Sequence, residues 1–382
     1  MISDQPERTA PFWPWDLLRT ESTHVLIHTL SPPLSYFDTA LAASRDGGMC
    51  VSQNNKYAIR CHDAGSAWCP CVPGIAGYCL ACPVITGAQA CDFCLWSGTC
   101  VYDHHFRHRG PIRIREFIST PVRQRQVIGH ELYLVRLELP GGWETELRRP
   151  GSFVMVKRPN DEDISAAPMA VCGVDSEEQT LTIVFQVRGP KTSALMCAES
   201  EWSLKGPYYG ALFGVRRLLK AFGKKVLILV SSTGQSLIPG VVGNLLEQEN
   251  DISIAIDPGL SGGLYILDNL KEFDGCVLAT RFYDTVTHAD LGRLSEIIGA
   301  SRADLIITLG SDFLHRDVAQ LLEPKQEWVA SNNSTMVCAD GLCGSCSIVL
   351  RDGTEIRGCK ADIAPEDVFW RDIDRAASGK EG

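Results

Sequence analysis

The chain has 382 residues, of which 45% are hydrophobic and 21% are charged, and its formal net charge is −10. A chain of this length can bury large cores and is expected to divide into about two to four domains. Its acidic balance argues against nucleic-acid binding, because affinity for the phosphate backbone depends mainly on lysine and arginine. It has no apolar run of about eighteen residues and no signal-peptide pattern, so we expect a cytoplasmic protein without a membrane span.

The 16 cysteines fall mainly into two groups, nine between positions 50 and 100 and four between positions 338 and 359. In a reducing compartment structural disulfides are rare, so such groups indicate metal ligands. The three remaining cysteines are Cys172, Cys197 and Cys276. We expect these three to be buried as small apolar side chains.

Residues 1–48 contain the apolar cluster FWPWDLL and a helical pattern over residues 35–45 that ends near two glycines. Capping and glycine signals of this kind are typical of a short helix. We therefore predict an anchor or interaction segment. Exposed Phe12, Trp13 and Trp15 would form a partner-binding patch, and the alternative is that they pack onto the chain's own cysteine-rich module.

Residues 49–108 show almost no helical or alternating period and are dense in cysteine, glycine and proline. Metal is therefore expected to hold this module together. The predicted ligands, preceded by Cys50 and by Cys61 beside His62, are Cys69, Cys71, Cys79, Cys82, Cys91, Cys94 and Cys100. Two C-x2-C pairs can converge on one tetrahedral metal, and the extra thiols can ligate a second centre. One or two 4Fe-4S clusters, zinc, and mixed or unfilled sites all remain open, although the compact spacing of bacterial ferredoxins is missing.

The basic stretch 104–115 follows this module. We interpret it as a solvated linker or an intramolecular docking surface, and an acidic protein partner is the alternative. Between residues 111 and 215 the pattern then changes to short strands, clearest at 131–140, 150–159 and 180–187, with glycine and proline between them. Alternating apolar residues of this kind predict a small antiparallel β-barrel.

Residues 220–328 alternate between strands and helices. The predicted strands are 225–230, 252–256, 276–280 and 304–309, and the predicted helices are 236–249, 287–298 and 312–323. Strands that alternate with helices imply parallel pairing, so this region is predicted to be a doubly wound α/β domain.

Residues 329–375 are predicted to form a small 2Fe-2S domain. Four cysteines follow the spacing C-x4-C-x2-C-x12-C: Cys338, Cys343, Cys346 and Cys359. Four thiolates are enough for such a cluster, and Gly341 and Gly344 allow the loop to wrap around it. A zinc knuckle is the alternative, although zinc sites usually consist of two C-x2-C pairs.

The order of barrel, doubly wound domain and cysteine loop resembles the electron-transfer subunit of the heteromeric dihydroorotate dehydrogenases, within the ferredoxin-NADP reductase superfamily. The gamma chain of sulfhydrogenases, the second chain of anaerobic sulfite reductase and the small subunit of bifurcating NADH-dependent ferredoxin:NADP reductase look similar. The resemblance covers about residues 111–375. Its most specific feature is the cysteine spacing, since plant ferredoxins place the fourth cysteine much further on. The bifurcating family can have an aspartate at the first ligand position, so Cys338 there implies four-thiolate ligation.

The resemblance implies that FAD binds the barrel through an R-P-[IM]-S-like segment and a G-x-G-T-like loop. The matching segments are 167–170 and 189–192, and the arginine and serine of the family are absent. The implied FAD contacts are Pro168, Met169, Ala170, Gly189, Lys191, Thr192 and Ser193. A barrel that serves only as a scaffold is the alternative.

Family members also have a glycine-rich phosphate loop after the first strand of the doubly wound domain. Here residues 231–236 read SSTGQS with a single glycine, and a later C-G-P-like turn reads LGS at residues 309–311. Thr233 and Gly234 are the candidate nucleotide contacts. NAD(P) binding and a purely structural Rossmann-type domain both stay open.

We therefore expect an electron-transfer subunit of a larger redox complex, which passes electrons between FAD, the 2Fe-2S cluster and N-terminal clusters to other redox subunits. No acid or base is assigned a catalytic role, because the chemistry would belong to the cofactors. One alternative is a self-sufficient NAD(P)H-dependent acceptor reductase. Another is a zinc-stapled scaffold without catalysis.

Overall fold

This computed structural model divides the chain into two units, Met1–Met49 and Cys50–Gly382. The described residues are 59–84 except 65, 70, 76–78, 81 and 83, then 102, and 114–379 except 199, 260–262, 271–275, 280, 281, 283–290, 324 and 325. The expectations for residues 1–48 lie outside them, as do those for Cys50, Cys91, Cys94 and Cys100.

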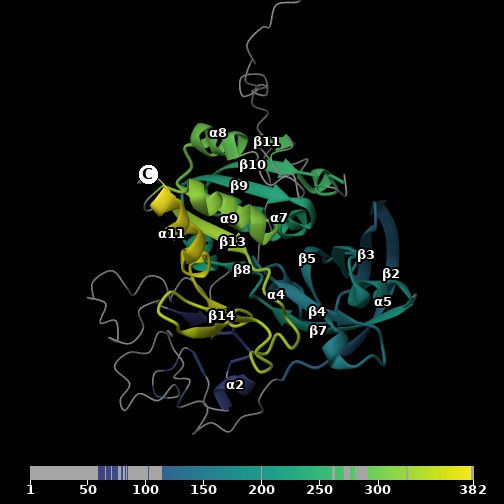
Figure 1. Cartoon of the computed structure of the whole chain (residues 1–382). Helices are drawn as coiled ribbons and strands as arrows, with labels where there is room; N and C mark the ends of the chain where they lie inside the picture. Colours follow the sequence, from purple (N-terminus) through teal and green to yellow (C-terminus); the bar gives the residue numbers. More distant parts are fainter. Residues whose placement is uncertain are drawn as a thin grey trace, which may run out of the picture. The chain divides into compact units, whose positions relative to one another are not determined.

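A closed six-stranded barrel follows residue 117, with strand order β2-β3-β6-β5-β4-β7. Its strands are β2 (Ile118–Gly129), β3 (Leu132–Glu138), β4 (Phe153–Lys157), β5 (Ala167–Asp175), β6 (Thr180–Gln186) and β7 (Glu201–Tyr208), joined by α4 (Glu144–Leu147), η2 (Asp163–Ser165) and α5 (Pro190–Met196). All neighbouring strands are antiparallel. Val135, Leu137 and Ile183 are fully buried in its core, because alternate side chains of a strand point to the same face. The predicted antiparallel barrel is confirmed (Figure 1).

The second sheet has the order β11-β10-β9-β12-β13-β8. Its strands are β8 (Leu212–Phe213), β9 (Lys225–Ser231), β10 (Asp251–Asp257), β11 (Cys276–Ala279), β12 (Leu305–Leu309) and β13 (Glu327–Ser331), and only β8 pairs antiparallel. Its helices are α6 (Val215–Leu219), η3 (Ser232–Leu237), α7 (Ile238–Leu246), η4 (Leu267–Leu270), α8 (Leu291–Ser301) and α9 (Asp312–Leu321).

Helices cover both faces of this sheet, as a doubly wound fold requires. In β9, Ile228 packs in one apolar core with side chains of α6 and α7. Its neighbour Leu229 packs in a different core with side chains of α8 and α9. Successive residues of one buried strand therefore enter opposite layers, and the predicted doubly wound domain is confirmed (Figure 1).

The segment after β9 differs from the single helix predicted for residues 236–249, because a 3-10 helix precedes a shorter α-helix. Residues 232–237 form the 3-10 helix η3, and α7 begins only at Ile238. A Cβ atom at Gly234 would lie 2.1 Å from the backbone oxygen of Leu309. Glycine is therefore needed here so that η3 can approach the end of β12.

We expect Gly234→Ala to destabilise the chain by about 1–3 kcal/mol, the usual cost of forcing an extra methyl group into packed structure. The matched control is Gly243→Ala in α7, where a Cβ atom meets nothing within 4 Å. That change should stabilise the helix by about 0.5–1 kcal/mol. Urea unfolding of both variants measures the difference, and equal stabilities would contradict the role given to Gly234.

The C-terminal region follows β13. It contains the hairpin β14 (Ser347–Val349) and β15 (Glu355–Arg357), the strand β16 (Ala361–Asp362), and the helices α10 (Pro365–Val368) and α11 (Trp370–Gly379). In the described part of the cysteine-rich module, regular structure consists of β1 (Arg60–Cys61) and α2 (Val72–Ile75). Strand β1 pairs antiparallel with β16. None of the helices in the described ranges is long and apolar enough to cross a membrane.

The isolated cysteines differ in their surroundings. Cys172 is 5% exposed in the core between barrel and sheet, as expected. The expectation for Cys197 is wrong, because this side chain is exposed. It follows the last residue of the short surface helix α5, where the chain turns without covering it. The side chain of Cys276 lies outside the described residues.

Candidate cofactor cavity and cysteine centres

A cavity of about 930 Å³ has one wall on the barrel and one on the doubly wound sheet. The barrel wall comes from β5, β6 and the start of α5, and the other wall from the carboxyl ends of β9, β12 and β13. Its volume is near the upper end of the range for small-molecule sites. The crevice beyond the carboxyl ends of parallel strands is also where doubly wound folds bind ligands.

The cavity brings together most of the residues that the sequence singled out. Its lining includes Pro168, Met169, Ala170, Gly189, Lys191, Thr192, Thr233 and Gly234. Ser193 does not line it and is exposed instead. The two segments proposed for flavin and the one proposed for nucleotide therefore face one shared space.

The loop before α5 is shaped by Thr192. Its Oγ1 accepts hydrogen bonds from the backbone N–H groups of Arg188 at 3.0 Å and Gly189 at 3.2 Å. The Thr192 hydroxyl therefore closes the turn. The Nζ of Lys191 donates to the backbone oxygen of Ala166 at 2.8 Å, and burial lowers the pKa of this amine. Two of the three donor positions of an ammonium group remain for a ligand.

Arg188 is a cavity residue that the sequence reasoning missed. Its Nε donates to Oε1 of Gln186 at 2.8 Å. Arg188 directly precedes Gly189, the first residue of the predicted flavin segment, and this position could have indicated a flavin contact. Together with Lys191 it supplies positive charge on the barrel wall, where the arginine of the family segment is absent. Two cations beside one loop suit a diphosphate, because arginine and lysine both bind phosphate oxygens.

The turn after β9 is closed by its own side chains. Gln235 is fully buried, and its Nε2 donates to the backbone oxygens of Ser232 at 3.1 Å and Gly263 at 2.9 Å. Ser236 and Tyr265 share a hydrogen bond of 3.0 Å between their hydroxyls. The turn therefore lacks the open, glycine-lined backbone of a phosphate loop.

The four C-terminal cysteines form two pairs. The sulfurs of Cys346 and Cys359 are 3.2 Å apart, and a hydrogen bond joins Cys343 to Cys338. The hydrogen bond that Cys346 shares with Cys359 lowers the pKa of Cys346 to about 6, and the same bond together with burial raises the pKa of Cys359 above its usual range. Partial desolvation raises the pKa of Cys343, but hydrogen bonds with Ser345 and Cys338 outweigh it and lower the value to about 7. The thiolate form is therefore favoured at Cys343 and at Cys346.

The number and pairing of these thiols suit a binuclear cluster. Two thiol pairs match two irons with two cysteines each. The loop between the pairs is wound through left-handed conformations at Ala339 (φ 56°), Gly341 (φ 80°) and Gly344 (φ 77°). The donor set therefore fits a 2Fe-2S cluster.

The cysteine loop and the cavity share one apolar core. Cys346 and Cys359 pack in it with Phe153, Tyr208 and Met336. Phe153 and Met336 also line the cavity. The same few side chains therefore separate the candidate cofactor space from the candidate cluster.

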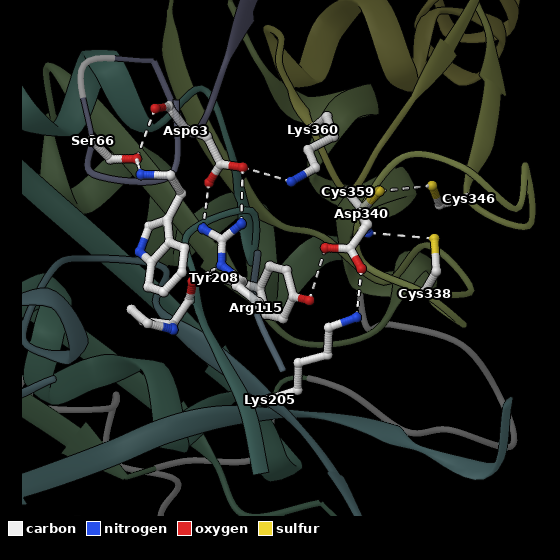
Figure 2. A network of polar contacts seen from close by, with 12 residues as sticks. Asp63, Ser66, Arg115, Lys205, Tyr208, Cys338, Asp340, Cys346, Cys359 and Lys360 are labelled. Atoms are coloured by element: carbon white, nitrogen blue, oxygen red, sulfur yellow. Dashed lines mark hydrogen bonds and ion pairs between the residues drawn. The ribbon is translucent and has the colours of Figure 1, made fainter. Parts of the chain in front are cut away.

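A buried ion network joins the cysteine-rich module to the barrel and to the C-terminal cysteine region (Figure 2). Asp63 receives hydrogen bonds from Arg115 at 3.0 and 2.6 Å and from Lys360 at 2.6 Å. Asp63 and Arg115 side chains are each 3% exposed and that of Lys360 is 5% exposed. Arg115 belongs to the basic stretch before the barrel, and Lys360 directly follows Cys359. One carboxylate thus neutralises cations from two distant segments.

The network continues to the first cluster cysteine. The guanidinium of Arg115 lies 4.4 Å from the centre of the Tyr208 ring. The Tyr208 hydroxyl donates to Asp340 at 3.0 Å, and Lys205 donates to the same carboxylate at 2.6 Å. The backbone N–H of Asp340 donates to the sulfur of Cys338 at 3.3 Å (Figure 2).

The structure also gathers part of the predicted N-terminal ligand set. Cys69, Cys79 and Cys82 lie in one small apolar cluster, and Cys61 completes it. Cys61 was outside the predicted set, although its position before the first C-x-C pair was a usable signal. Cys71 lies close to this cluster without being part of it.

Comparisons with known proteins agree with this architecture, although no family model matches the chain. A probable dihydroorotate dehydrogenase B (NAD(+)), electron transfer subunit, from Methanopyrus kandleri is 26% identical over 281 residues, which are 66% of this chain and 98% of the relative. The corresponding subunit from Enterococcus faecalis is 24% identical over 61% of this chain and 88% of its own length.

Among solved structures, the NADH-dependent reduced ferredoxin-NADP oxidoreductase, studied for flavin-based electron bifurcation, has a TM-score of 0.51 and 18% identity. The matched region covers 71% of this chain and 95% of the oxidoreductase chain. The barrel and the doubly wound domain together therefore have the fold of this oxidoreductase. In sequence, the chain is similar to the electron-transfer subunits of dihydroorotate dehydrogenase B.

Proposed function

We propose that the chain is the electron-transfer subunit of a larger cytoplasmic redox complex, with FAD on the barrel and a 2Fe-2S cluster on Cys338, Cys343, Cys346 and Cys359. The observation that supports this proposal is the shared apolar core, because Phe153 and Met336 line the cavity and belong to the same core as Cys346 and Cys359. Bound FAD would supply the conversion between two-electron and one-electron transfer.

Residues on the barrel wall would hold FAD in the cavity. Lys191 and Arg188 would bind the diphosphate, because both are cavity cations beside one turn. Pro168 and Met169 on β5 would pack against the flavin ring. The apolar side chains between the cavity and the cysteines would exclude water from the electron path.

The exposed edge of the cysteine loop is where we expect a partner subunit to approach. Cys343 is exposed, whereas Cys346 and Cys359 are each 3% exposed. Leu342 beside it is 54% exposed. An apolar side chain next to a solvent-facing ligand suits a protein surface that must come close to exchange electrons.

We infer that the electrons are exchanged with partner subunits in preference to NAD(P)H. The support is the turn after β9, where the buried Gln235 side chain donates to the backbone oxygens of Ser232 and Gly263. The relatives from Methanopyrus kandleri and Enterococcus faecalis carry NAD(+) in their names, so the nicotinamide alternative is tested directly. Anaerobic addition of NADH or NADPH should leave the flavin absorbance unchanged, and rapid bleaching would favour the self-sufficient reductase.

The test of the main proposal is the cofactor content of the anaerobically purified chain. We expect about one flavin and at least about two irons with matching acid-labile sulfide per chain. Photoreduction of the flavin should then produce the paramagnetic signal of a reduced 2Fe-2S cluster. A chain with zinc, without flavin and without iron would contradict the proposal and support the scaffold alternative.

Lys191→Met is expected to weaken FAD binding about 10- to 100-fold, because a hydrogen bond to a charged group contributes about 1.5–3 kcal/mol. The matched control is Lys220→Met, since Lys220 is exposed and does not line the cavity. Flavin fluorescence during titration of the flavin-free chain measures both dissociation constants. Equal affinities in the two variants would remove Lys191 from the site.

A further inference from the structure

Four thiols of the cysteine-rich module meet outside the cluster loop already described. Cys79 and Cys82 are each 7% exposed and pack together. Cys61 and Cys69 pack against them, with Val84 as the apolar neighbour. Buried cysteines often serve only as small apolar side chains. Four in one small cluster, within a segment whose described part contains only β1 and α2 as regular elements, require a further explanation.

Local contacts set the positions of the first two thiols. Cys61 ends β1 and pairs with Ala361 of β16. The N–H of Cys69 donates to the backbone oxygen of Ser66 at 3.2 Å, and the Ser66 hydroxyl donates to that of Asp63 at 2.8 Å. A segment this short needs a cross-link besides apolar burial. In a reducing compartment, metal is the cross-link that clustered thiols provide.

The position of the thiols favours an iron–sulfur cluster over zinc. Four cysteines that pack in one small cluster suit the four-cysteine ligation of either centre. Their neighbour is the C-terminal cysteine domain, whose donor set suits a 2Fe-2S cluster. A second iron–sulfur cluster could exchange electrons with it, whereas zinc has no redox chemistry.

The segment that carries the thiol cluster contacts the C-terminal cysteine domain. The N–H of His62 donates to the backbone oxygen of Lys360 at 2.8 Å, and the Lys360 ammonium contacts Asp63 at 2.6 Å. Lys360 directly follows Cys359. A Cβ atom at Gly341 would lie 3.4 Å from Cγ of Pro73 in α2. The module therefore contacts the cluster loop at two separate points.

We propose that Cys61, Cys69, Cys79 and Cys82 ligate a second iron–sulfur cluster, which the contacts of Asp63 and His62 with Lys360 hold against the C-terminal cysteine domain. Cys71 does not belong to this ligand set. It is outside the thiol cluster and accepts a hydrogen bond from the backbone of Gly74. The ligand set is independent of the flavin, and only a role in electron transfer rests on the proposed function.

The test compares the full-length wild type, Cys61→Ser and Cys71→Ser, all purified anaerobically. Iron, zinc and acid-labile sulfide are measured, and paramagnetic resonance spectra are recorded after reduction with dithionite. We expect the wild type to contain iron beyond the about two atoms of a 2Fe-2S cluster. Cys61→Ser should lose part of this additional iron together with one resonance signal, and it should keep the 2Fe-2S signal. Cys71→Ser should match the wild type.

Three results would overturn the proposal: zinc in place of the additional iron in the wild type, unchanged iron in Cys61→Ser, or an equal loss in Cys71→Ser. The wild-type stoichiometry does not depend on the folding of any variant, so a misfolded Cys61→Ser chain still leaves a decisive measurement. Failure of the proposed function looks different, because the flavin or the 2Fe-2S signal would then be missing from the wild type.

Discussion

Cys346→Ser is expected to remove the C-terminal cluster and with it the electron transfer to external one-electron acceptors. Cys346 is 3% exposed and lies 3.2 Å from Cys359, so a serine there breaks one of the two thiol pairs. Changes around metal ligands alone cost about 10- to 100-fold in metal affinity, so loss of a ligand should cost more than about 100-fold. Iron analysis and acceptor reduction from the photoreduced flavin measure the effect.

The flavin content of Cys346→Ser should stay the same, because the cavity wall on the barrel is untouched. Cys197→Ser is the matched control, since this cysteine is exposed at the end of α5 and belongs to neither cysteine group in the sequence. It should retain all iron and full acceptor reduction. If Cys346→Ser retained the 2Fe-2S signal, the ligand assignment would be wrong.

Asp63→Ala is expected to destabilise the contact between the cysteine-rich module and the rest of the chain by about 3–5 kcal/mol. This is the usual cost of breaking a buried ion pair by removing one partner, because the remaining charge stays buried without compensation. Here two cations lose their carboxylate, Arg115 and Lys360. Thermal unfolding measures the loss, and limited proteolysis of the segment around residues 59–84 shows whether the module has detached.

The matched control is Glu138→Gln. Glu138 pairs with Arg123 on the surface, where the two side chains are 43% and 60% exposed. Surface pairs of this kind contribute about 0–1 kcal/mol. Similar losses in Asp63→Ala and Glu138→Gln would mean that the buried network does not hold the module.

The stability of the same contact should depend on pH, because the pKa values of Asp63 and Lys360 are both shifted. Burial would raise the pKa of Asp63, but Lys360 and Arg115 outweigh it and hold this pKa well below its usual range. Burial would lower the pKa of Lys360, but Asp63 outweighs it and raises this pKa above its usual range. The stabilisation is therefore present above about pH 4, is lost as the pH falls further, and is lost again above about pH 10.

Unfolding temperatures of the wild type and Asp63→Ala should accordingly differ by a constant amount between about pH 5 and pH 9. The difference should shrink in acid, because protonated Asp63 no longer compensates Arg115 and Lys360. If the difference in unfolding temperature grew as the pH fell below about 4, the expected role of Asp63 would be wrong.

Much of the fold followed from local patterns. The alternation in β3 and β6 predicted the barrel, since both strands bury one face. The buried runs of β9 and β12 between helices predicted the doubly wound domain. Strand β2 was less visible, because most of its residues are exposed or partly exposed and the apolar period is weak. Local patterns predict elements only where burial repeats with the period of the backbone.

For the candidate site, the sequence by itself determined the cysteine spacing and the flavin and nucleotide segments that contribute to the cavity lining. Only the tertiary structure placed Arg188 in the cavity, paired the four cluster cysteines two by two, and brought Cys61 to Cys69, Cys79 and Cys82. It also joined Asp63 to Arg115 and Lys360, which are 52 and 297 residues away in the chain. Contacts between such distant segments depend on burial and strand pairing, and no local period records which charges will meet.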